Sequence, residues 1–219
     1  GSLYLGALRA AEEMARDERV FCIGEDIAVP GGWGGAFTVT LGLSEEFGHE
    51  RMLDTPISEI AIAGVAVGAA MAGMRPIADV QYGDFLFCMM DQLANQAAKM
   101  RYVYGGKVSI PMVVRAVAGA GFRAASEHSQ TLYSLYTHIP GLKVVAPSTP
   151  ADVVGLLAAS IRDPDPVVFL EPKRVYRAFR EQVPEDDEPM PIGKARRARE
   201  GSDLTLIGWG AMLQPTLEA

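Results

Sequence analysis

Short apolar runs alternate with longer helical patterns along most of this chain. Each run has the length of a β-strand and is apolar at consecutive positions, which is typical of strands buried on both faces. After an opening helix, we therefore predict an α/β fold with a mainly parallel sheet covered by helices on both sides. The predicted strands are Val20–Ile23, Arg51–Asp54, Pro76–Gln81, Met112–Val117, Leu142–Ala146 and Val167–Leu170, and the predicted helices are Ser58–Gly73, Asp84–Tyr102, Gln130–Tyr136 and Ala151–Arg162.

The alternation ends after Glu171-Pro172-Lys173. Residues 1–172 are predicted to form one α/β domain, and residues 173–201 a charged linker punctuated by prolines. A further strand is predicted over Asp203–Trp209. Residues 202–219 would then be the start of a second α/β domain, because a single strand cannot form a domain by itself.

Glu59 precedes the stretch Ile60–Met74, which contains no charged residue. Thr55 is a candidate N-cap and Pro56 suits the first helical position. The helix is apolar on every face, so it should be enclosed by protein, and it is shorter than the ~20 residues that span a bilayer. Burial disfavours an ionised Glu59 and the positive helix end favours it, so this group could share or pass a proton. Alternatively, Glu59 only complements the helix dipole.

Composition narrows the class of protein. The 219 residues are 49% hydrophobic and 21% charged, with a net charge of −7, which is typical of a globular protein. An acidic chain argues against a nucleic-acid partner, and no membrane segment is apparent. Cys22 and Cys88 lie in apolar runs and are predicted to be buried thiols of a reducing compartment. The cytoplasm, or the mitochondrial matrix in a eukaryote, is the expected location.

Several loops carry candidate chemistry. Gly31–Gly35 is glycine-rich but lacks the Gly-Lys-Ser/Thr of a phosphate-binding loop, so a flexible surface loop is the simpler interpretation. Gly119–Ala124 matches a dinucleotide fingerprint formally, without the acidic residue about 20 positions later. His128 lies in a polar loop after the fourth predicted strand, where a ligand could meet it. Phe85 could present its ring to a flat heterocycle or pack in the core.

Together these segments resemble the β subunits of the thiamine diphosphate-dependent decarboxylating component of 2-oxo acid dehydrogenase complexes, and the related acetoin dehydrogenases. The resemblance covers nearly the whole chain to about Tyr176. The segments that carry it are Gly24–Asp26, Asp54–Glu59, Gln81–Phe85, Asp91-Gln92, Gln96–Lys99, Arg101-Tyr102, His128–Gln130, Pro140–Val145, Pro147-Ser148 and Ile161–Val167.

The resemblance implies roles for five residues. Glu59 would hydrogen-bond a pyrimidine nitrogen of thiamine diphosphate and so help the cofactor to lose its reactive proton. Phe85 would stack on the aminopyrimidine, with Ile57 and Gln81 lining the same end of the pocket. His128 would orient substrate and assist acyl transfer to a lipoyl arm.

The resemblance also implies partners. In the family, Mg²⁺ and the diphosphate are held by a Gly-Asp-Gly…Asn motif on an α subunit, and Gly83-Asp84-Phe85 does not supply it. We therefore expect an α2β2 heterotetramer, docked on a lipoyl-bearing acyltransferase core. A potassium ion bound mainly by main-chain carbonyls would correspond to Met112, Ser160, Asp163 and Asp165.

The expected function is that of an oxidoreductase subunit that decarboxylates pyruvate or a branched-chain 2-oxo acid and transfers the acyl group to lipoamide. Cleavage of acetoin is the alternative. Trp33–Gly35, Gly119–Ala125 and Ser134–Pro140 resemble acetoin-type members, whereas Phe169–Lys173 resembles the pyruvate and branched-chain members. A non-catalytic assembly module is the alternative from a different class.

Overall fold

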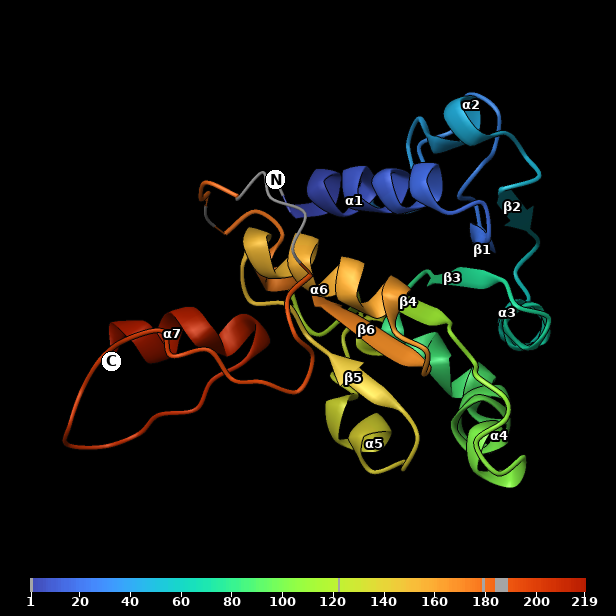
Figure 1. Cartoon of the computed structure of the whole chain (residues 1–219). Coiled ribbons are helices and arrows are strands. Elements are labelled where there is room, and N and C mark those ends of the chain that lie inside the picture. Colours follow the sequence, from blue (N-terminus) through green and yellow to red (C-terminus); the bar gives the residue numbers. More distant parts are fainter. Residues whose placement is uncertain (1, 122, 179, 184–188) are drawn as a thin grey trace.

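The computed structural model describes residues 2–121, 123–178, 180–183 and 189–219, with the side chains of residues 2–5 left out. Phe122 of the fingerprint-like loop and the acidic residues 185–188 of the predicted linker lie outside these ranges. A six-stranded sheet forms the centre, in the order β2-β1-β3-β4-β6-β5, and every neighbouring pair is parallel (Figure 1). This confirms the predicted fold class. The strands are β1 Val20–Glu25, β2 Met52–Thr55, β3 Arg75–Val80, β4 Val113–Ala118, β5 Lys143–Val145 and β6 Val167–Pro172.

Helices cover both faces of the sheet. Helices α1 and α6 pack together on one face, and α3, α4 and α5 lie on the other (Figure 1). The helices are α1 Ser2–Arg16, α2 Leu43–Phe47, α3 Glu59–Met71, α4 Ala98–Val103, α5 Tyr133–Thr137, α6 Pro150–Arg162 and α7 Leu213–Glu218, with short 3₁₀ turns at Gly83–Met89, Ser126–His128, Lys173–Val175 and Gly210–Met212 and a π-helical segment at Asp91–Ala97.

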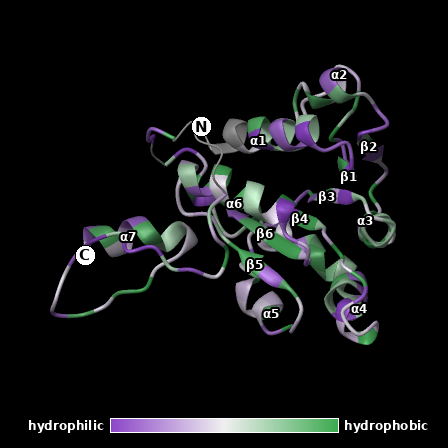
Figure 2. Ribbon diagram, in the orientation of Figure 1, coloured by the Kyte–Doolittle hydropathy of each residue, from purple (hydrophilic) through white to green (hydrophobic). Residues whose placement is uncertain are grey.

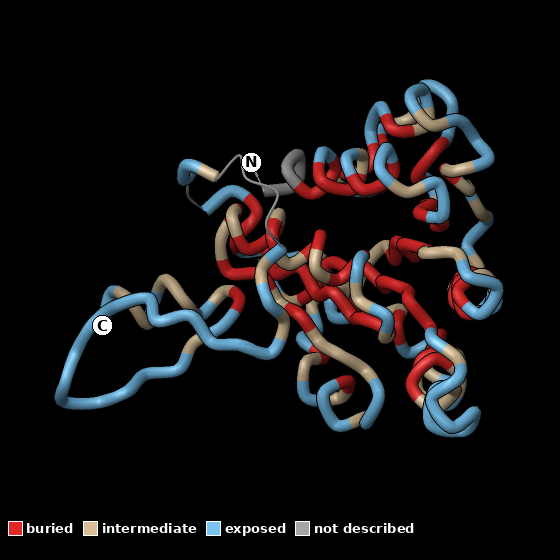
Figure 3. The backbone as a smooth tube through the Cα atoms, in the orientation of Figure 1, coloured by how far each residue is buried: buried red, intermediate tan, exposed pale blue. Residues whose placement is uncertain are grey.

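The sheet separates two apolar cores. Because side chains alternate along a strand, Phe21 and Ile23 of β1 face the α3 side, while Val20 and Cys22 face α1 and α6. The buried residues follow the strands and the inner faces of the helices (Figure 3). A strand with both faces covered has no solvent-exposed side, which explains the continuous apolar runs in the sequence.

The parallel arrangement decides where a site can form. All the loops that follow β1, β2, β3, β4 and β6 leave from the same edge of the sheet. Glu59, Gln81, Phe85 and His128 all lie in or just after these loops.

Three local predictions were wrong. Thr55 is not an N-cap, because it ends β2 by pairing with Glu25, and Ser58 precedes the first helical residue instead. The helix predicted over Asp84–Tyr102 is a 3₁₀ segment, a π-helical segment and an α-helix in succession. Cys88 is exposed rather than buried. It lies in the 3₁₀ segment, whose three-residue repeat turns it to the surface.

The strand predicted over Asp203–Trp209 is also absent. Leu204, Leu206 and Ile207 are 70%, 59% and 82% exposed, and this segment extends away from the sheet as a long loop (Figures 1 and 2). A strand needs a neighbouring strand to satisfy its backbone hydrogen bonds, and no described strand pairs with this segment. The predicted domain boundaries stay predictions.

Of the helices in the described ranges, none has the length and apolar character that crossing a membrane requires.

Candidate active site

Two acidic residues, Glu25 and Glu59, lie at the carboxyl edge of the sheet. Glu59 is the first residue of α3 and is half-buried, and Glu25 ends the neighbouring strand β1, opposite Thr55 of β2. Burial and the negative charge of Glu59 both raise the pKa of Glu25. Ile57, in the loop before Glu59, is 77% exposed. This corner therefore holds two acidic residues that interact electrostatically and an uncovered aliphatic side chain.

Gln81 ties the loop after β1 to the end of β3. Its Oε1 accepts a hydrogen bond of 3.0 Å from the Ala36 main-chain N–H, and its Nε2 donates to Asp79 Oδ1 at 3.0 Å and to the Glu25 carbonyl at 3.4 Å. Gly35 lies so close that a Cβ there would be 2.8 Å from Gln81 Nε2. The glycine-rich loop is therefore fastened to the sheet at this end, and the interpretation as a flexible surface loop was wrong there.

His128 is enclosed by aromatic rings. Its ring meets that of Tyr82 edge-on at 4.3 Å between centroids and that of Phe85 at 5.4 Å. The His128 side chain is 29% exposed, but its Nδ1 is buried without a hydrogen-bond partner. The structure thus brings two residues singled out in the sequence, Phe85 and His128, into direct contact. Phe85 also packs against the core, which confirms that interpretation, while its contact with a heterocycle stays a prediction.

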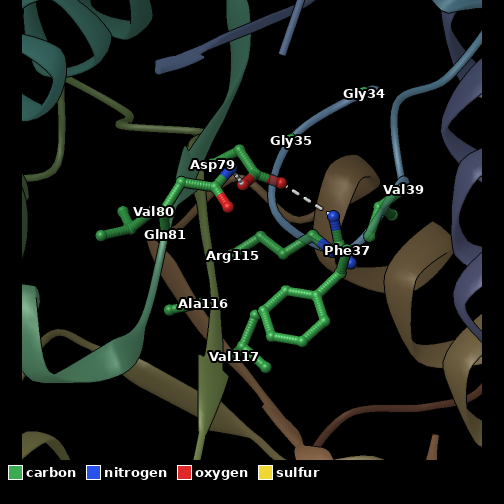
Figure 4. Close-up of a pocket in the computed structure, with 10 residues that line it drawn as sticks. All are labelled: Gly34, Gly35, Phe37, Val39, Asp79, Val80, Gln81, Arg115, Ala116 and Val117. Atoms are coloured by element: carbon green, nitrogen blue, oxygen red, sulfur yellow. Dashed lines mark hydrogen bonds and ion pairs between the residues drawn. The ribbon is translucent and has the colours of Figure 1, made fainter. Parts of the chain in front are cut away.

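A buried ionic network lies beneath the loops. Arg115 of β4 donates to both carboxylate oxygens of Glu171, at 2.6 and 2.7 Å. It also donates to Asp79 Oδ2 at 2.8 Å (Figure 4). Tyr176 donates its hydroxyl to Glu171 Oε2 at 2.7 Å. Burial opposes the charge of Arg115, but the two carboxylates raise its pKa, and burial also raises the pKa of Asp79 and of Tyr176. The arginine therefore stays a cation shared between two acids.

Strand alternation explains this network. Asp79 and Arg115 are register partners in β3 and β4, and their apolar neighbours at alternate positions belong to the α1–α6 core. Glu171 occupies the corresponding face of β6. The sequence analysis missed all of these residues. The signal that could have found them is one charged residue among the buried apolar residues of each strand, because a buried charge needs a partner of opposite charge.

The interior beneath these loops holds little empty space. A cavity of about 10 Å³, bordered by Phe37, Gln81 and Arg115, has room for about one water molecule (Figure 4). Phe37 lies edge-on to the rings of both Tyr82 and Tyr176. A cavity of this size is too small for a heterocycle.

The four residues predicted to hold potassium lie at the other end of the sheet. The Met112, Ser160 and Asp163 carbonyls accept hydrogen bonds from Val167 N, Asp163 N and Arg75 Nη1. The side chains of Asp163 and Asp165 are engaged by Lys143. A carbonyl oxygen keeps a second lone pair, so the potassium site stays a prediction.

The sequence of this chain matches a known family. Residues 6–178 match the family described as "Transketolase, pyrimidine binding domain". The chain belongs to this family. Its fold resembles that of a solved structure titled "Split gene transketolase, inactive beta4 tetramer", with a TM-score of 0.76 and 19% identity over 99% of this chain and 65% of that one.

Two curated relatives are equally similar in sequence. The chain is 50% identical over 218 residues to the 2-oxoisovalerate dehydrogenase subunit beta of Bacillus subtilis (strain 168), covering 99% of this chain and 66% of the relative. It is also 50% identical over 215 residues to the acetoin:2,6-dichlorophenolindophenol oxidoreductase subunit beta of Cupriavidus necator, covering 95% of this chain and 63% of that relative. The chain thus spans slightly less than two thirds of each relative.

Proposed function

We propose that this chain is the pyrimidine-binding part of the β subunit of a thiamine diphosphate-dependent 2-oxo acid dehydrogenase. With an α subunit, it would decarboxylate a 2-oxo acid and pass the acyl group to lipoamide. The observation that carries this proposal is the half-buried Glu59, at the start of an apolar helix and near enough to Glu25 for its charge to raise the pKa of that residue.

The residues at the carboxyl edge of the sheet suit an aminopyrimidine. A flat heterocycle with a ring nitrogen needs a carboxyl group as hydrogen-bond partner and an aromatic or aliphatic surface for its faces. Glu59 supplies the first, and Phe85 with the exposed Ile57 supplies the second. The amide of Gln81 is already bonded to Ala36, Asp79 and Glu25, so we assign to it the shaping of the pocket wall.

Each side chain has a distinct task in this proposal. When bound, thiamine diphosphate supplies the carbanion chemistry of decarboxylation. Glu59 holds a proton on its carboxyl group and donates it to the ring nitrogen, a task for which an acid shielded from water is suited. His128 orients the substrate and assists acyl transfer.

The outer face of α3 points to a partner subunit. The helix is apolar around its whole circumference (Figure 2), yet Ile60, Val65 and Met71 are 60%, 49% and 44% exposed. A Cβ added at Gly64 or Gly68 on this helix would meet nothing within 4 Å. Another backbone could therefore approach closely. We assign this face to the α subunit, which would also bring the Mg²⁺ and diphosphate site and complete an α2β2 tetramer docked on a lipoyl-bearing acyltransferase core.

The substrate is a 2-oxo acid, pyruvate or a branched-chain one, in the main proposal. The second candidate is acetoin, because a relative named for acetoin is as similar to this chain as one named for 2-oxoisovalerate. A cytoplasmic location, or the mitochondrial matrix in a eukaryote, accords with either function and with the two free thiols.

The test is an assay of the intact protein co-purified with its α subunit. Pyruvate, branched-chain 2-oxo acids and acetoin are compared as substrates, with lipoamide as acceptor. Calorimetry should show tight binding of thiamine diphosphate and Mg²⁺ by the complex and weak binding by this chain alone. Tight binding by this chain alone would contradict the division of the site between two subunits.

The variant Glu59→Gln distinguishes a catalytic subunit from a non-catalytic assembly module. Turnover should fall about 10²- to 10⁴-fold because the carboxyl proton is lost, while the complex still assembles. Glu46→Gln, at an exposed position of α2, is the matched control and should keep full turnover. A fully active Glu59→Gln complex would support the non-catalytic module instead.

A further inference from the structure

Lys173 is a buried cation that lies beside His128. It follows β6, in the 3₁₀ turn Lys173–Val175, and is only 6% exposed. Its ammonium donates a hydrogen bond to the main-chain carbonyl of His128 and lies 5.2 Å from the centroid of the Tyr82 ring. The same Tyr82 ring packs edge-on against the His128 imidazole. Lys173 therefore contacts both the backbone and the aromatic support of His128.

A second buried charge holds the same loop. Asp84 is 5% exposed, and its Oδ1 accepts the main-chain N–H of Gln130 at 3.1 Å. The negative charge of Asp84 favours the charged form of Lys173, while burial lowers the pKa of the lysine. Lys173 therefore bonds to the loop at position 128, and Asp84 bonds to it at position 130. The two residues carry opposite charges and follow different strands, β6 and β3.

The backbone of this loop requires such support. Arg123 and Ala125 have φ angles of +58° and +65°, a left-handed region that is unfavourable for residues other than glycine. Such conformations persist where the surroundings fix them. Gly121 also packs so closely against the lysine that a Cβ there would lie 2.8 Å from Lys173 Cβ.

We propose that Lys173 is a positioning residue, which holds His128 against Phe85 through the His128 carbonyl and the Tyr82 ring. The inference rests on the role of His128 in the proposed function, and it adds a residue that acts on the reaction only through that histidine. A lysine suits this position because its flexible stem can pack along the loop while its ammonium donates several hydrogen bonds.

The first test compares three variants in the intact complex with its α subunit. Lys173→Met keeps the length of the side chain but removes the charge and the donor, so turnover should fall about 10- to 100-fold, the effect of a small misplacement of a reacting group. Lys173→Arg retains a donor and should restore most of the turnover. Lys107→Met, at an exposed position, is the matched control and should change nothing. Unchanged turnover in Lys173→Met would overturn the inference.

The second test measures the position of His128 without turnover. The chain has three histidines, so acylation by diethyl pyrocarbonate can be followed at each by mass spectrometry. In Lys173→Met, His128 should react severalfold faster than in the parent protein, because its loop is released. His49 and His138 should react at their original rates, which also shows that the protein remains folded. Equal reactivity of His128 in both proteins would contradict the proposed contact.

The third test separates this inference from the proposed function. If Lys173 acts through His128, adding Lys173→Met to a His128→Asn complex should lower turnover no further. The same loss in both backgrounds would assign Lys173 a general structural role and overturn the inference. If His128→Asn alone leaves turnover unchanged, the catalytic role of His128 fails, and the acylation rates still decide whether Lys173 holds this residue.

Discussion

The two sides of the sheet's carboxyl edge are built differently. Around β3, β4 and β6, a buried ionic network is satisfied within the chain, as Arg115 shows with its two carboxylate partners. Around β1, β2 and α3, acids and apolar side chains remain open to solvent, as the exposed Ile57 and Ile60 show. We call the first side the closed side, because its buried charges have their partners within the chain. We call the second side the open side, because it presents apolar surface that a monomeric protein would normally cover.

In the proposed function, this difference corresponds to a division of the site between two subunits. A buried charge network fixes the strand ends, so the His128 loop and Gln81 rest on a rigid base. The Glu59 side leaves room for a ligand and for a partner helix. We infer that the buried charge network of this chain supports the site from within, and that the α subunit covers the Glu59 side.

The largest expected effect comes from disrupting the buried ionic network of the closed side. Arg115→Met should lower the free energy of unfolding by about 3–5 kcal/mol, because Asp79 and Glu171 would be left buried and unpaired. The control is Arg101→Met, which removes an exposed pair with Asp165 and should cost about 0–1 kcal/mol. Urea unfolding measures both. Equal costs would mean that the network contributes no more than a surface pair, and Arg115→Lys tests the requirement for a two-pronged donor.

The next effect probes the open side. Val65→Glu on α3 should change the stability of this chain by no more than about 0.5 kcal/mol, because the side chain is already exposed. It should weaken association with the α subunit by about 2 kcal/mol, or roughly 30-fold, if the helix face is an interface. Val103→Glu, on the exposed end of α4, makes the same chemical change elsewhere and should leave association intact. Analytical ultracentrifugation distinguishes them.

A milder change tests how much redundancy the closed side has. Tyr176→Phe removes one hydrogen bond to Glu171, while both bonds from Arg115 remain, so the loss should be about 1 kcal/mol. Tyr102→Phe, at a residue that is 88% exposed, should leave the unfolding midpoint unchanged. A loss as large as that of Arg115→Met would show that the tyrosine, and not the arginine, organises the network.

The smallest effect concerns pH on the open side. The folded-state pKa of Glu25 lies above its usual value of 4.5, so the folded protein gains relative stability when Glu25 is protonated and loses it as pH rises through that pKa. Glu25→Gln should therefore be more stable than the parent protein at pH 7, by about 1 kcal/mol or less because the group is partly exposed. Thermal unfolding across pH should show this advantage disappearing in acid. A constant advantage at every pH would assign the effect to packing.

Much of the fold was predictable from local pattern. All six strands of the sheet lie within two residues of the predicted limits, because strands enclosed by helices need continuous apolar runs. The positions of Glu59, Phe85 and His128 after strands also placed them at one edge. Errors arose where pairing decided the outcome. Thr55 joins the strand because Glu25 lies opposite, and the Asp203–Trp209 segment forms no strand because no described strand pairs with it.

The sequence by itself determined the parallel sheet, its two apolar cores and the edge at which chemistry could gather, since these follow from the spacing of apolar residues and from chain direction. Only the tertiary structure decided which polar groups meet there. Arg115 and Glu171 are 56 positions apart, and Lys173 lies 45 positions from the carbonyl that it holds. Periodicity describes neighbours within one element, and such distant partners are brought together only when the strands take their order in the sheet.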